Sequence, residues 1–291
     1  MTYAASSRYD PPMLADSNGQ VGWRAELALE YARRGARTVL AARRHDGPLV
    51  VQKPLYPEGD AVCHTIVVHP PGGIAGGDEL RLSARLDVNA HALLTTPGAG
   101  KWYRSVGAAA RQAIQFDVSA GACLEWLPQE NIIFNGASAE LRTAVRLSGD
   151  ASFIGWEICC FGRTGSGETF TSGGFRGRMF IERDHRPLWL ENGRLEGGGA
   201  VLQSPVVLAG QPVAATLLAA SDKLDAHGLA ACREIRPLNG DGAVTLLPGL
   251  LIGRYLGPSS EAAKNYFIQL WHSLRPAVAG RDAIDPRIWR T

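Results

Sequence analysis

The feature that most constrains the fold of this chain is a two-residue alternation of apolar and polar side chains in short runs. In residues 80–88, leucine, alanine and valine alternate with arginine, serine and aspartate. Successive side chains of a β-strand point to opposite faces, so this run is typical of a strand with one buried face. Comparable runs predict strands over residues 21–31, 38–42, 49–52, 65–68, 91–96, 113–118, 122–127, 141–147, 153–161, 178–183, 188–191, 206–208 and 213–219. Many short strands separated by turn residues favour a mainly β fold of layered, stacked sheets with few helices.

Two segments favour helices instead. Residues 222–235 form a possible helix, weakened by Gly228 and closed by Pro237. After Pro258 a serine can cap a second helix near the C-terminus, in which apolar residues recur at helical spacing: Ala263, Tyr266, Phe267, Leu270, Trp271 and Leu274. Arg275 and Pro276 are expected to end this helix. Its apolar stripe, together with Trp289, packs either on the protein's own sheet or against a partner.

Composition limits the class of protein. The 291 residues are 45% hydrophobic and 20% charged, which suits a globular chain. Residues 1–20 are polar and contain prolines, so we expect a flexible arm followed by a single β-rich domain over residues 21–291. A net charge of +2 gives no field that favours nucleic acid or an acidic membrane. Neither a secretory signal nor a transmembrane helix is expected, so the protein is expected in the cytoplasm.

The metal-ligating residues are dispersed. Five cysteines lack C-x-x-C spacing, and their odd number argues against a disulfide framework, so reduced and buried thiols are expected. The adjacent Cys159 and Cys160 would point to opposite faces of a strand. His64 and His69 would do the same. The sequence therefore predicts neither a high-affinity zinc or nickel site nor a tightly bound cofactor.

A glycine-rich turn separates two of the expected strands. Residues 69–78 contain four glycines and two prolines and end in Asp78. The glycines permit positive φ and close backbone approach, so a ligand, an ion or another segment could lie against the turn, or it could be a plain connection. Nucleotide-binding loops are excluded by spacing, because a dinucleotide fingerprint would need glycine where Ile74 stands, and a phosphate loop would need Ser or Thr where Trp102 follows Lys101. A second glycine-rich loop, residues 162–167, has no assigned role.

Three stretches together carry a family resemblance: residues 69–78, 95–104 and 124–131. In this order they resemble the urease accessory protein family UreD, also called UreH. Supporting matches occur at Trp156–Glu157 with Gly162–Arg163, at residues 186–189, and at residues 274–276 with 286–289. The resemblance covers about residues 20–291.

The resemblance implies a function that composition and spacing do not reveal. Members of the family are not enzymes. They form a complex with UreF and the GTPase UreG, bind apo-urease and help to insert nickel into its active site. The family fold is β-rich and layered, and an internal solvent-filled passage is proposed as the nickel route. The resemblance thus implies a non-catalytic chaperone that contacts nickel transiently.

Nickel moving through a protein interior would need oxygen ligands, and each site must be incomplete so that the ion is released. Asp78 and Glu130 are the predicted transient metal contacts, although both could instead cap local turns by accepting backbone N–H bonds. Further candidates for lining the passage or binding a partner come from the family-like motifs: Thr95, Thr96, Lys101, Tyr103, Arg104, Glu125, Gln129, Asn131, Glu157 and Arg163.

An enzyme is the main alternative. A cytoplasmic, β-rich, carbohydrate-active hydrolase could use two of Glu125, Glu130 and Glu157 as an acid and base pair. Such a pair requires two carboxylates about 5–9 Å apart across one groove. Glu125 and Glu157 both stand beside tryptophans in strand-like segments, which suits a sugar site.

Overall fold

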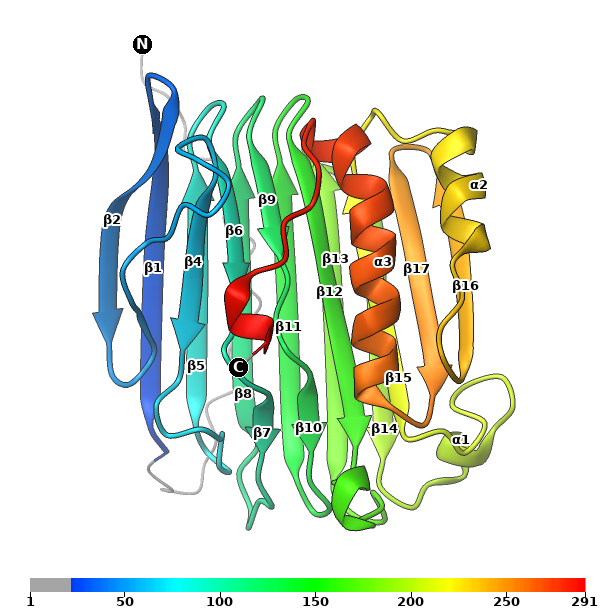
Figure 1. Ribbon diagram of the computed structural model, residues 1–291. Coiled ribbons are helices and arrows are strands. Elements are labelled where there is room, and N and C mark those ends of the chain that lie inside the picture. Colours follow the sequence, from blue (N-terminus) through cyan, green and yellow to red (C-terminus); the bar gives the residue numbers. More distant parts are fainter. Residues whose placement is uncertain (1–21, 291) are drawn as a thin grey trace.

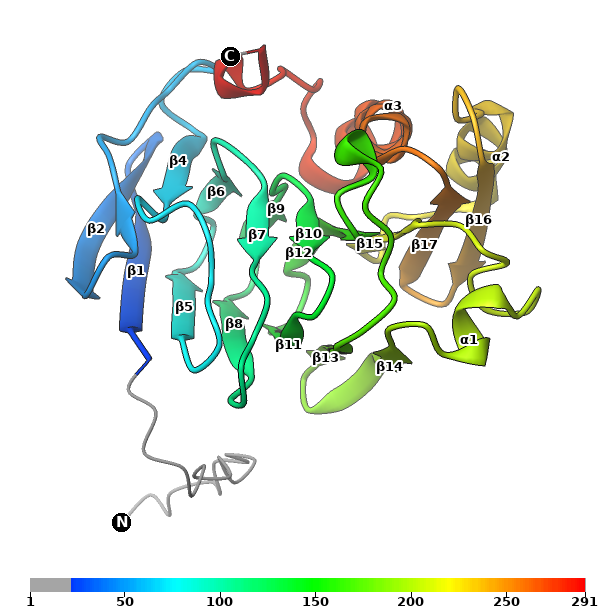
Figure 2. The same ribbon diagram turned by 90° about the horizontal axis from the view of Figure 1, so that it is seen from below.

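The structure, a computed structural model that describes residues 22–290, consists of two stacked β-sheets with the two longest helices on one outer face (Figures 1 and 2). The predicted mainly β, layered fold with few helices is confirmed. The arm predicted over residues 1–20 lies outside the described residues. The single domain predicted over residues 21–291 stays a prediction.

The first sheet has seven strands in the order β14 (Arg186–Glu196), β13 (Gly174–Arg183), β11 (Ser138–Leu147), β8 (Ala110–Val118), β5 (Glu79–Leu86), β1 (Arg24–Arg34) and β2 (Arg37–Asp46). The second has ten strands, of which eight follow the order β16 (Asp241–Leu247), β17 (Leu250–Gly257), β15 (Val213–Ala220), β12 (Ser152–Phe161), β9 (Cys123–Trp126), β6 (His91–Thr95), β4 (Cys63–Val68) and β3 (Val50–Val51). The short strands β10 (Asn131–Ile133) and β7 (Gly100–Trp102) attach beside β12.

The middle of the chain winds as a solenoid. Between β4 and β13 the chain passes repeatedly from one sheet to the other, and strands of successive coils pair in parallel within each sheet. The glycine turn is therefore not a hairpin loop, because it carries the chain from β4 in the ten-stranded sheet to β5 in the seven-stranded sheet. Antiparallel pairs complete both ends, with β2 on β1 at one end and β14 to β17 at the other.

The ten-stranded sheet is buried on both faces. Its inner face packs on the seven-stranded sheet in one large hydrophobic cluster, while its outer face forms a second cluster with α2 (Ala226–Glu234) and α3 (Ser260–Ala279). This explains why β9 and β12 are nearly continuous apolar runs, whereas β5 alternates. The adjacent Cys159 and Cys160 join different clusters, as predicted, and all five cysteines are free and buried.

The C-terminal helix begins where the sequence predicts and ends later. Ser259 caps α3 by accepting a hydrogen bond from the Ala262 N–H at 3.2 Å. The expectation that Arg275 and Pro276 end the helix is wrong: α3 continues to Ala279 and stops at Gly280, whose N–H bonds to the Pro276 carbonyl in a left-handed cap. Proline removes its own N–H donor and its ring crowds the carbonyl one turn earlier, and the buried side chains of this last turn, Arg275 and Val278, offset that cost.

The apolar stripe of α3 packs on the protein's own sheet, and so does the tail. Trp289, in the 3₁₀ helix η2 (Arg287–Arg290), lies 5.7 Å from both Trp156 and Trp271, and its indole N–H donates to Thr95 at 2.9 Å. Figure 1 shows the tail crossing the ten-stranded sheet beside α3. The interpretation of the stripe and tail as a partner interface is therefore not supported, and the stripe is not an exposed patch that would limit solubility.

Other differences follow from local turn chemistry. Residues 206–208 form a turn after α1 (Ala200–Gln203) instead of a strand, with positive φ at Ala209 and Gly210. The helix expected over residues 222–235 is shorter. It begins after Asp225, whose side chain caps the first turn by accepting the Gly228 N–H. Strands β16 and β17 were not predicted, although Pro248 and Gly249 join them in a tight hairpin. The loop at 162–167 contains the 3₁₀ helix η1 (Thr164–Ser166).

Candidate functional site

Two cavities lie between the sheets, and one carboxylate borders both. The first, of about 280 Å³, extends inward from the glycine turn and is lined on its way by His69, Gly73, Thr96, Gln129 and Glu157. The second, of about 370 Å³, lies near the antiparallel end of the sandwich between β12, β13, β14, β15 and β17, and it also includes Glu157. Side chains alternate along β12, so Glu157 shares the inner face with Cys159 and Phe161.

The pKa of the Glu157 carboxyl group is shifted into the neutral range. Burial raises the pKa of Glu157, the Cys159 thiol, which donates to Oε1 at 3.7 Å, opposes this rise, and the charge of the nearby Glu191 adds to it, so that the pKa is about 7. The carboxyl group therefore exists in both protonation states near neutral pH. A cation that reaches it competes with a proton, which keeps the binding of that cation reversible.

The glycine turn is shaped by its own carboxylate. Asp78 accepts the Trp23 N–H at 2.8 Å and the Ala75 N–H at 2.7 Å. Gly73 is required for space, because a Cβ there would lie 2.2 Å from the ring of Tyr103. Asp78 is not among the residues that line either cavity within the described part of the chain. Its observed contacts are those of a turn cap, and its predicted metal contact stays a prediction.

Several motif residues gather at the cavity under the turn. The Thr96 hydroxyl accepts the Gln129 N–H at 2.9 Å, and the Gln129 side chain accepts from Lys264 of α3 at 2.6 Å. Asn131 accepts the Trp102 indole N–H at 3.0 Å. Thr96, Lys101, Gln129 and Asn131 all line the cavity that reaches Glu157. The sequence motifs thus mark one end of this cavity.

Three other candidates lie around Phe134 and Gly136. Tyr103 contacts Phe134 edge to face with 5.2 Å between ring centroids, and the Arg163 guanidinium lies 4.8 Å from the centroid of the Phe134 ring. Arg163 also forms a two-bond pair with Glu168 at 2.9 and 3.0 Å, which fixes the glycine-rich loop. Arg104 lies against Gly136. None of Tyr103, Arg104 and Arg163 lines the two cavities among the described residues.

Thr95 and Glu130 lie apart from the cavities. The Thr95 hydroxyl donates to the Leu127 carbonyl at 2.6 Å and accepts from Trp289, so it anchors the tail. Burial lowers the pKa of Lys264 and the charge of Glu130 opposes this shift, which places the Glu130 carboxylate near α3. The metal contact predicted for Glu130 stays a prediction.

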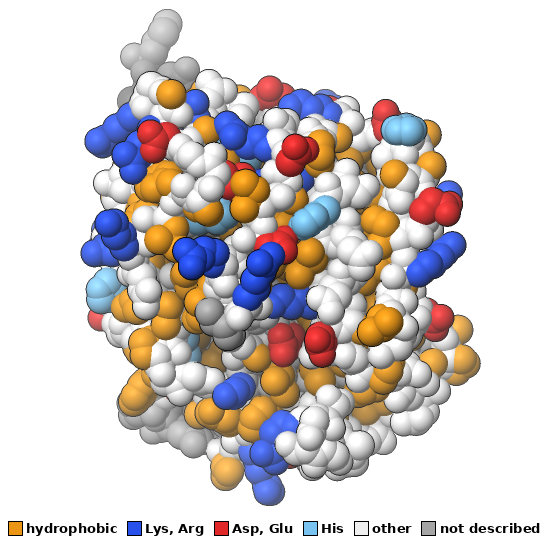
Figure 3. All heavy atoms as spheres, viewed as in Figure 1, with side chains coloured by type: hydrophobic (Ala, Val, Ile, Leu, Met, Phe, Trp, Pro, Cys, Tyr) orange, Lys and Arg blue, Asp and Glu red, His pale blue; other side chains and the backbone are white. Residues whose placement is uncertain are grey.

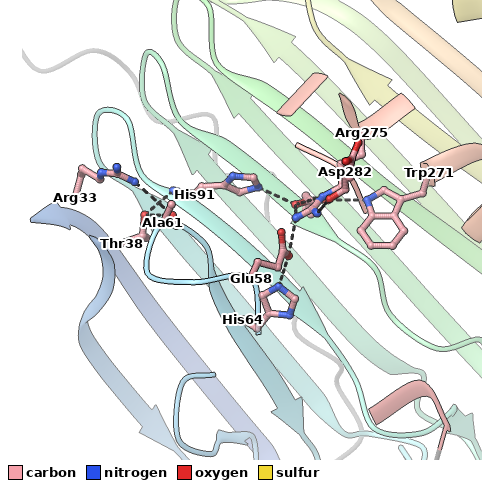
Figure 4. Close-up of polar contacts among 10 residues, drawn as sticks. Arg33, Thr38, Glu58, Ala61, His64, His91, Trp271, Arg275 and Asp282 are labelled. Carbon is pink, nitrogen blue, oxygen red and sulfur yellow. Dashed lines mark hydrogen bonds and ion pairs between the residues drawn. The ribbon is translucent and has the colours of Figure 1, made fainter. Parts of the chain in front are cut away.

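Glu125 belongs to a buried ionic cluster on the opposite face of the ten-stranded sheet. Its carboxylate is fully buried and accepts hydrogen bonds from Trp271 at 2.6 Å, from His91 at 2.7 Å and from Arg275 at 2.9 and 3.0 Å. Arg275 also donates to Glu58 at 2.7 Å, and Glu58 pairs with His64 at 2.6 Å. Figure 4 shows Arg275 between these groups. The cluster ties α3 to the sheet and to the segment before β4.

The members of this cluster keep one another in the charged form. Burial alone would raise the pKa of Glu125, but His91 and Arg275 outweigh it and hold the pKa at about 2. Burial alone would lower the pKa of His91, but Cys123 and Glu125 outweigh it and raise the pKa to about 10. Both groups are therefore charged at neutral pH, and their role is structural.

The sequence did not identify Glu58, His91 or Arg275 as members of such a cluster. Two signals were available. Arg275 stands four residues after Trp271, on the apolar stripe of α3, and Glu125 stands in a strand whose other residues are all apolar. A charge at a buried position requires a partner of opposite sign, so a pairing of Glu125 with Arg275 could have been predicted from these two positions.

The hydrolase alternative needs two carboxylates facing one groove. Glu125 contacts α3 on the outer face of the sheet, whereas Glu157 lies between the sheets, so these two do not meet across a shared site. Within residues 22–290, no three or more His, Cys, Asp or Glu side chains are close enough to hold a metal ion. None of the described helices is long and apolar enough to cross a lipid bilayer. The face that carries α3 shows basic, acidic and hydrophobic side chains interspersed (Figure 3).

Comparison with known sequences agrees with the predicted family. The profile of the UreD urease accessory protein family matches residues 24–290. The urease accessory protein UreD of Azoarcus sp. is 60% identical over 272 residues, which cover 94% of this chain and 95% of that protein. The proteins of the same name from Dechloromonas aromatica and Pseudomonas fluorescens are 54% and 52% identical, each covering 92% of this chain and 95% of the relative. The chain therefore belongs to the family of UreD urease accessory proteins.

Proposed function

We propose that this urease accessory protein is a non-catalytic maturation factor that binds apo-urease together with UreF and UreG in the cytoplasm. In this role it lets nickel pass between its two sheets on the way to the urease active site. Nickel is the cargo of the protein and is not retained as a cofactor. The family resemblance supports the choice of partners, and the cavities between the sheets support the choice of route.

The observation that carries the proposal is the position of Glu157. Glu157 is among the lining residues of both inter-sheet cavities, so it is the carboxylate that an ion in either cavity can reach. A single carboxylate with a pKa of about 7 offers one oxygen donor and exchanges nickel for a proton. Transfer requires such incomplete coordination, because a full set of ligands would retain the ion.

The path is proposed to begin at the glycine turn. Thr96, Gln129 and Asn131 supply oxygen atoms along the cavity, and Asp78 keeps the turn in shape by accepting two backbone N–H groups. Glu125 is left out of the path, because the ionic cluster holds it on the other face of the sheet. Tyr103, Arg104 and Arg163, which lie around Phe134 and Gly136, are proposed as partner-binding residues.

The test is urease activation at limiting nickel. Glu157→Gln keeps the size of the side chain and removes the exchangeable charge, so the complex with UreF and apo-urease should assemble while urease activation falls several-fold. Glu140→Gln is the matched control, because Glu140 pairs with arginines away from the cavities on the seven-stranded sheet. Asp78→Asn and Glu130→Gln test the two predicted metal contacts in the same assay. Normal activation by Glu157→Gln at limiting nickel would refute the route.

A further inference from the structure

A row of three polar side chains crosses the inner face of the ten-stranded sheet in the larger cavity. Glu157 of β12 is directly opposite Thr216 of β15, and Thr216 is directly opposite Arg254 of β17. All three line this cavity. Neighbouring strands are about 4.8 Å apart, so Glu157 and Arg254 originate about 10 Å from each other on one face. A carboxylate and a guanidinium thus share the same inter-sheet space.

Arg254 is held from both sheets. Its Nη1 donates to Glu191 of β14 at 2.6 Å and to Thr216 at 2.7 Å, and the guanidinium lies 5.6 Å from the centroid of the Trp189 ring. Glu191 comes from the seven-stranded sheet and lies close enough to Glu157 for its charge to act on that carboxyl group. The guanidinium therefore lies where a mobile cation would find a carboxylate and a hydroxyl oxygen.

Arg178 also borders this cavity, but its side chain does not take the same position as Arg254. Arg178 alternates with Met179 along β13, and Met179 is part of the buried core, so the Arg178 side chain belongs to the opposite face of that sheet. Asp241 lies at the exposed end of the cavity. The acidic side chains at this cavity are thus Glu157, Glu191 and Asp241, and Arg254 is the cation placed among them.

We propose that Arg254 is a tethered cation that competes with nickel for the oxygen ligands of this cavity and thereby keeps nickel from being retained there. This inference rests on the proposed function, in which nickel enters the space between the sheets. The guanidinium occupies Oε1 of Glu191, so a nickel ion that binds this carboxylate must displace the guanidinium or bind against its positive charge. When the ion leaves, the guanidinium returns to the carboxylate, so release costs less than it would from a bare acidic cavity.

A purely structural role makes a different prediction. The Arg254–Glu191 pair joins the two sheets, and both side chains are partly exposed, at 42% and 34%. If the pair served only to hold the sheets together, its removal would lower thermal stability slightly and leave nickel binding unchanged. Competition by a tethered cation predicts stronger nickel binding when the positive charge is removed.

The experiment measures Ni²⁺ binding to the purified full chain by equilibrium dialysis, with a thermal melt of each variant. Arg254→Gln should raise the association constant for Ni²⁺ roughly tenfold, which is the effect of losing one charged hydrogen-bonded competitor. Arg254→Lys keeps the charge and should remain within about twofold of the wild type. Adding Glu191→Gln to Arg254→Gln should reverse the gain, because the ligand itself is then neutral.

Unchanged nickel binding by a folded Arg254→Gln variant would overturn the proposal. If that variant does not fold, Arg254→Met tests the same point, because it removes the positive charge and keeps an apolar side chain of similar length. Nickel binding should again rise roughly tenfold, and no rise would overturn the proposal. The readout is nickel binding by the chain alone, so a failure here leaves the urease-activation test of Glu157→Gln standing, and the reverse also holds.

Discussion

Replacing Arg275 by methionine should destabilise the protein strongly. The guanidinium is fully buried, and it donates to Glu125, to Glu58 and to the Asp282 carbonyl. Removing one partner of a buried ion pair costs about 3–5 kcal/mol, because the remaining charge stays buried without compensation. Here two carboxylates lose a partner, although each keeps a histidine. The unfolding entropy of a chain of this length is about 0.6 kcal/mol/K, so the melting temperature should fall by about 5–8 °C.

The assay is thermal and urea unfolding at neutral pH, followed by circular dichroism. Arg194→Met is the matched control, because the Arg194–Glu196 pair is about two-thirds exposed and its loss should cost under 1 kcal/mol. The difference in the free energy of unfolding between Arg275→Met and the wild type should become smaller as pH falls below about 4.5. The stability that comes from the low pKa of Glu125 is present above that pH and is lost toward pH 2. A loss below about 1 kcal/mol for Arg275→Met would refute the assignment of this cluster as the anchor of α3.

Three further measurements test the structure. The pKa of His91 is raised from 6.5 to about 10, so its stabilising pairing with Glu125 is complete below pH 6.5 and is lost as pH rises toward 10. The free energy of unfolding of the wild type should therefore fall over this pH range, and that of His91→Gln should fall less. Calorimetry on the isolated chain should find Ni²⁺ binding weaker than micromolar, and a submicromolar site abolished by one His or Cys substitution would contradict the incomplete-ligand argument. The five cysteines should react with a thiol reagent only after unfolding, when all five become titratable; fast labelling of the native protein would show that the cores described here open readily.

The sheet architecture could be predicted because alternation encodes burial directly. Strands such as β5 and β11 have one face in the core and the other in solvent, and both were predicted from their two-residue period. Which strands pair could not be predicted, because alternation describes only the faces of a strand and not its neighbours. The parallel coils depend on chain crossovers, which leave no two-residue signal.

The candidate site was only partly accessible from sequence. Thr96, Lys101, Gln129 and Asn131 lie in family-like motifs, and they do converge on one cavity. Asp78 and Glu130 were selected as isolated carboxylates, but the cavity lining depends on which way each side chain points relative to two stacked sheets. Glu191 and Arg254 were missed because they come from different sheets and meet only after the antiparallel end has folded.

Sequence also cannot separate the two faces of a fully buried strand. Glu125 and Glu157 stand in similar apolar contexts beside tryptophans, yet one faces α3 and the other faces the inter-sheet cavities. Only the placement of α3 over the outer face of the ten-stranded sheet assigns them different roles. The contrast follows from packing, which the local pattern does not contain.

The distance along the chain between Glu125 and Arg275 has a consequence for synthesis. The two residues are 150 positions apart. A ribosome that adds about 5–20 residues per second makes Glu125 about 8–30 s before Arg275. During that time the solenoid coils can form and His91 can pair with Glu125, but the outer face of the ten-stranded sheet has neither its helix nor the guanidinium of Arg275. The outer face of the ten-stranded sheet can therefore be covered only after α3 has been made, and until then a large apolar surface is open to whatever binds it first.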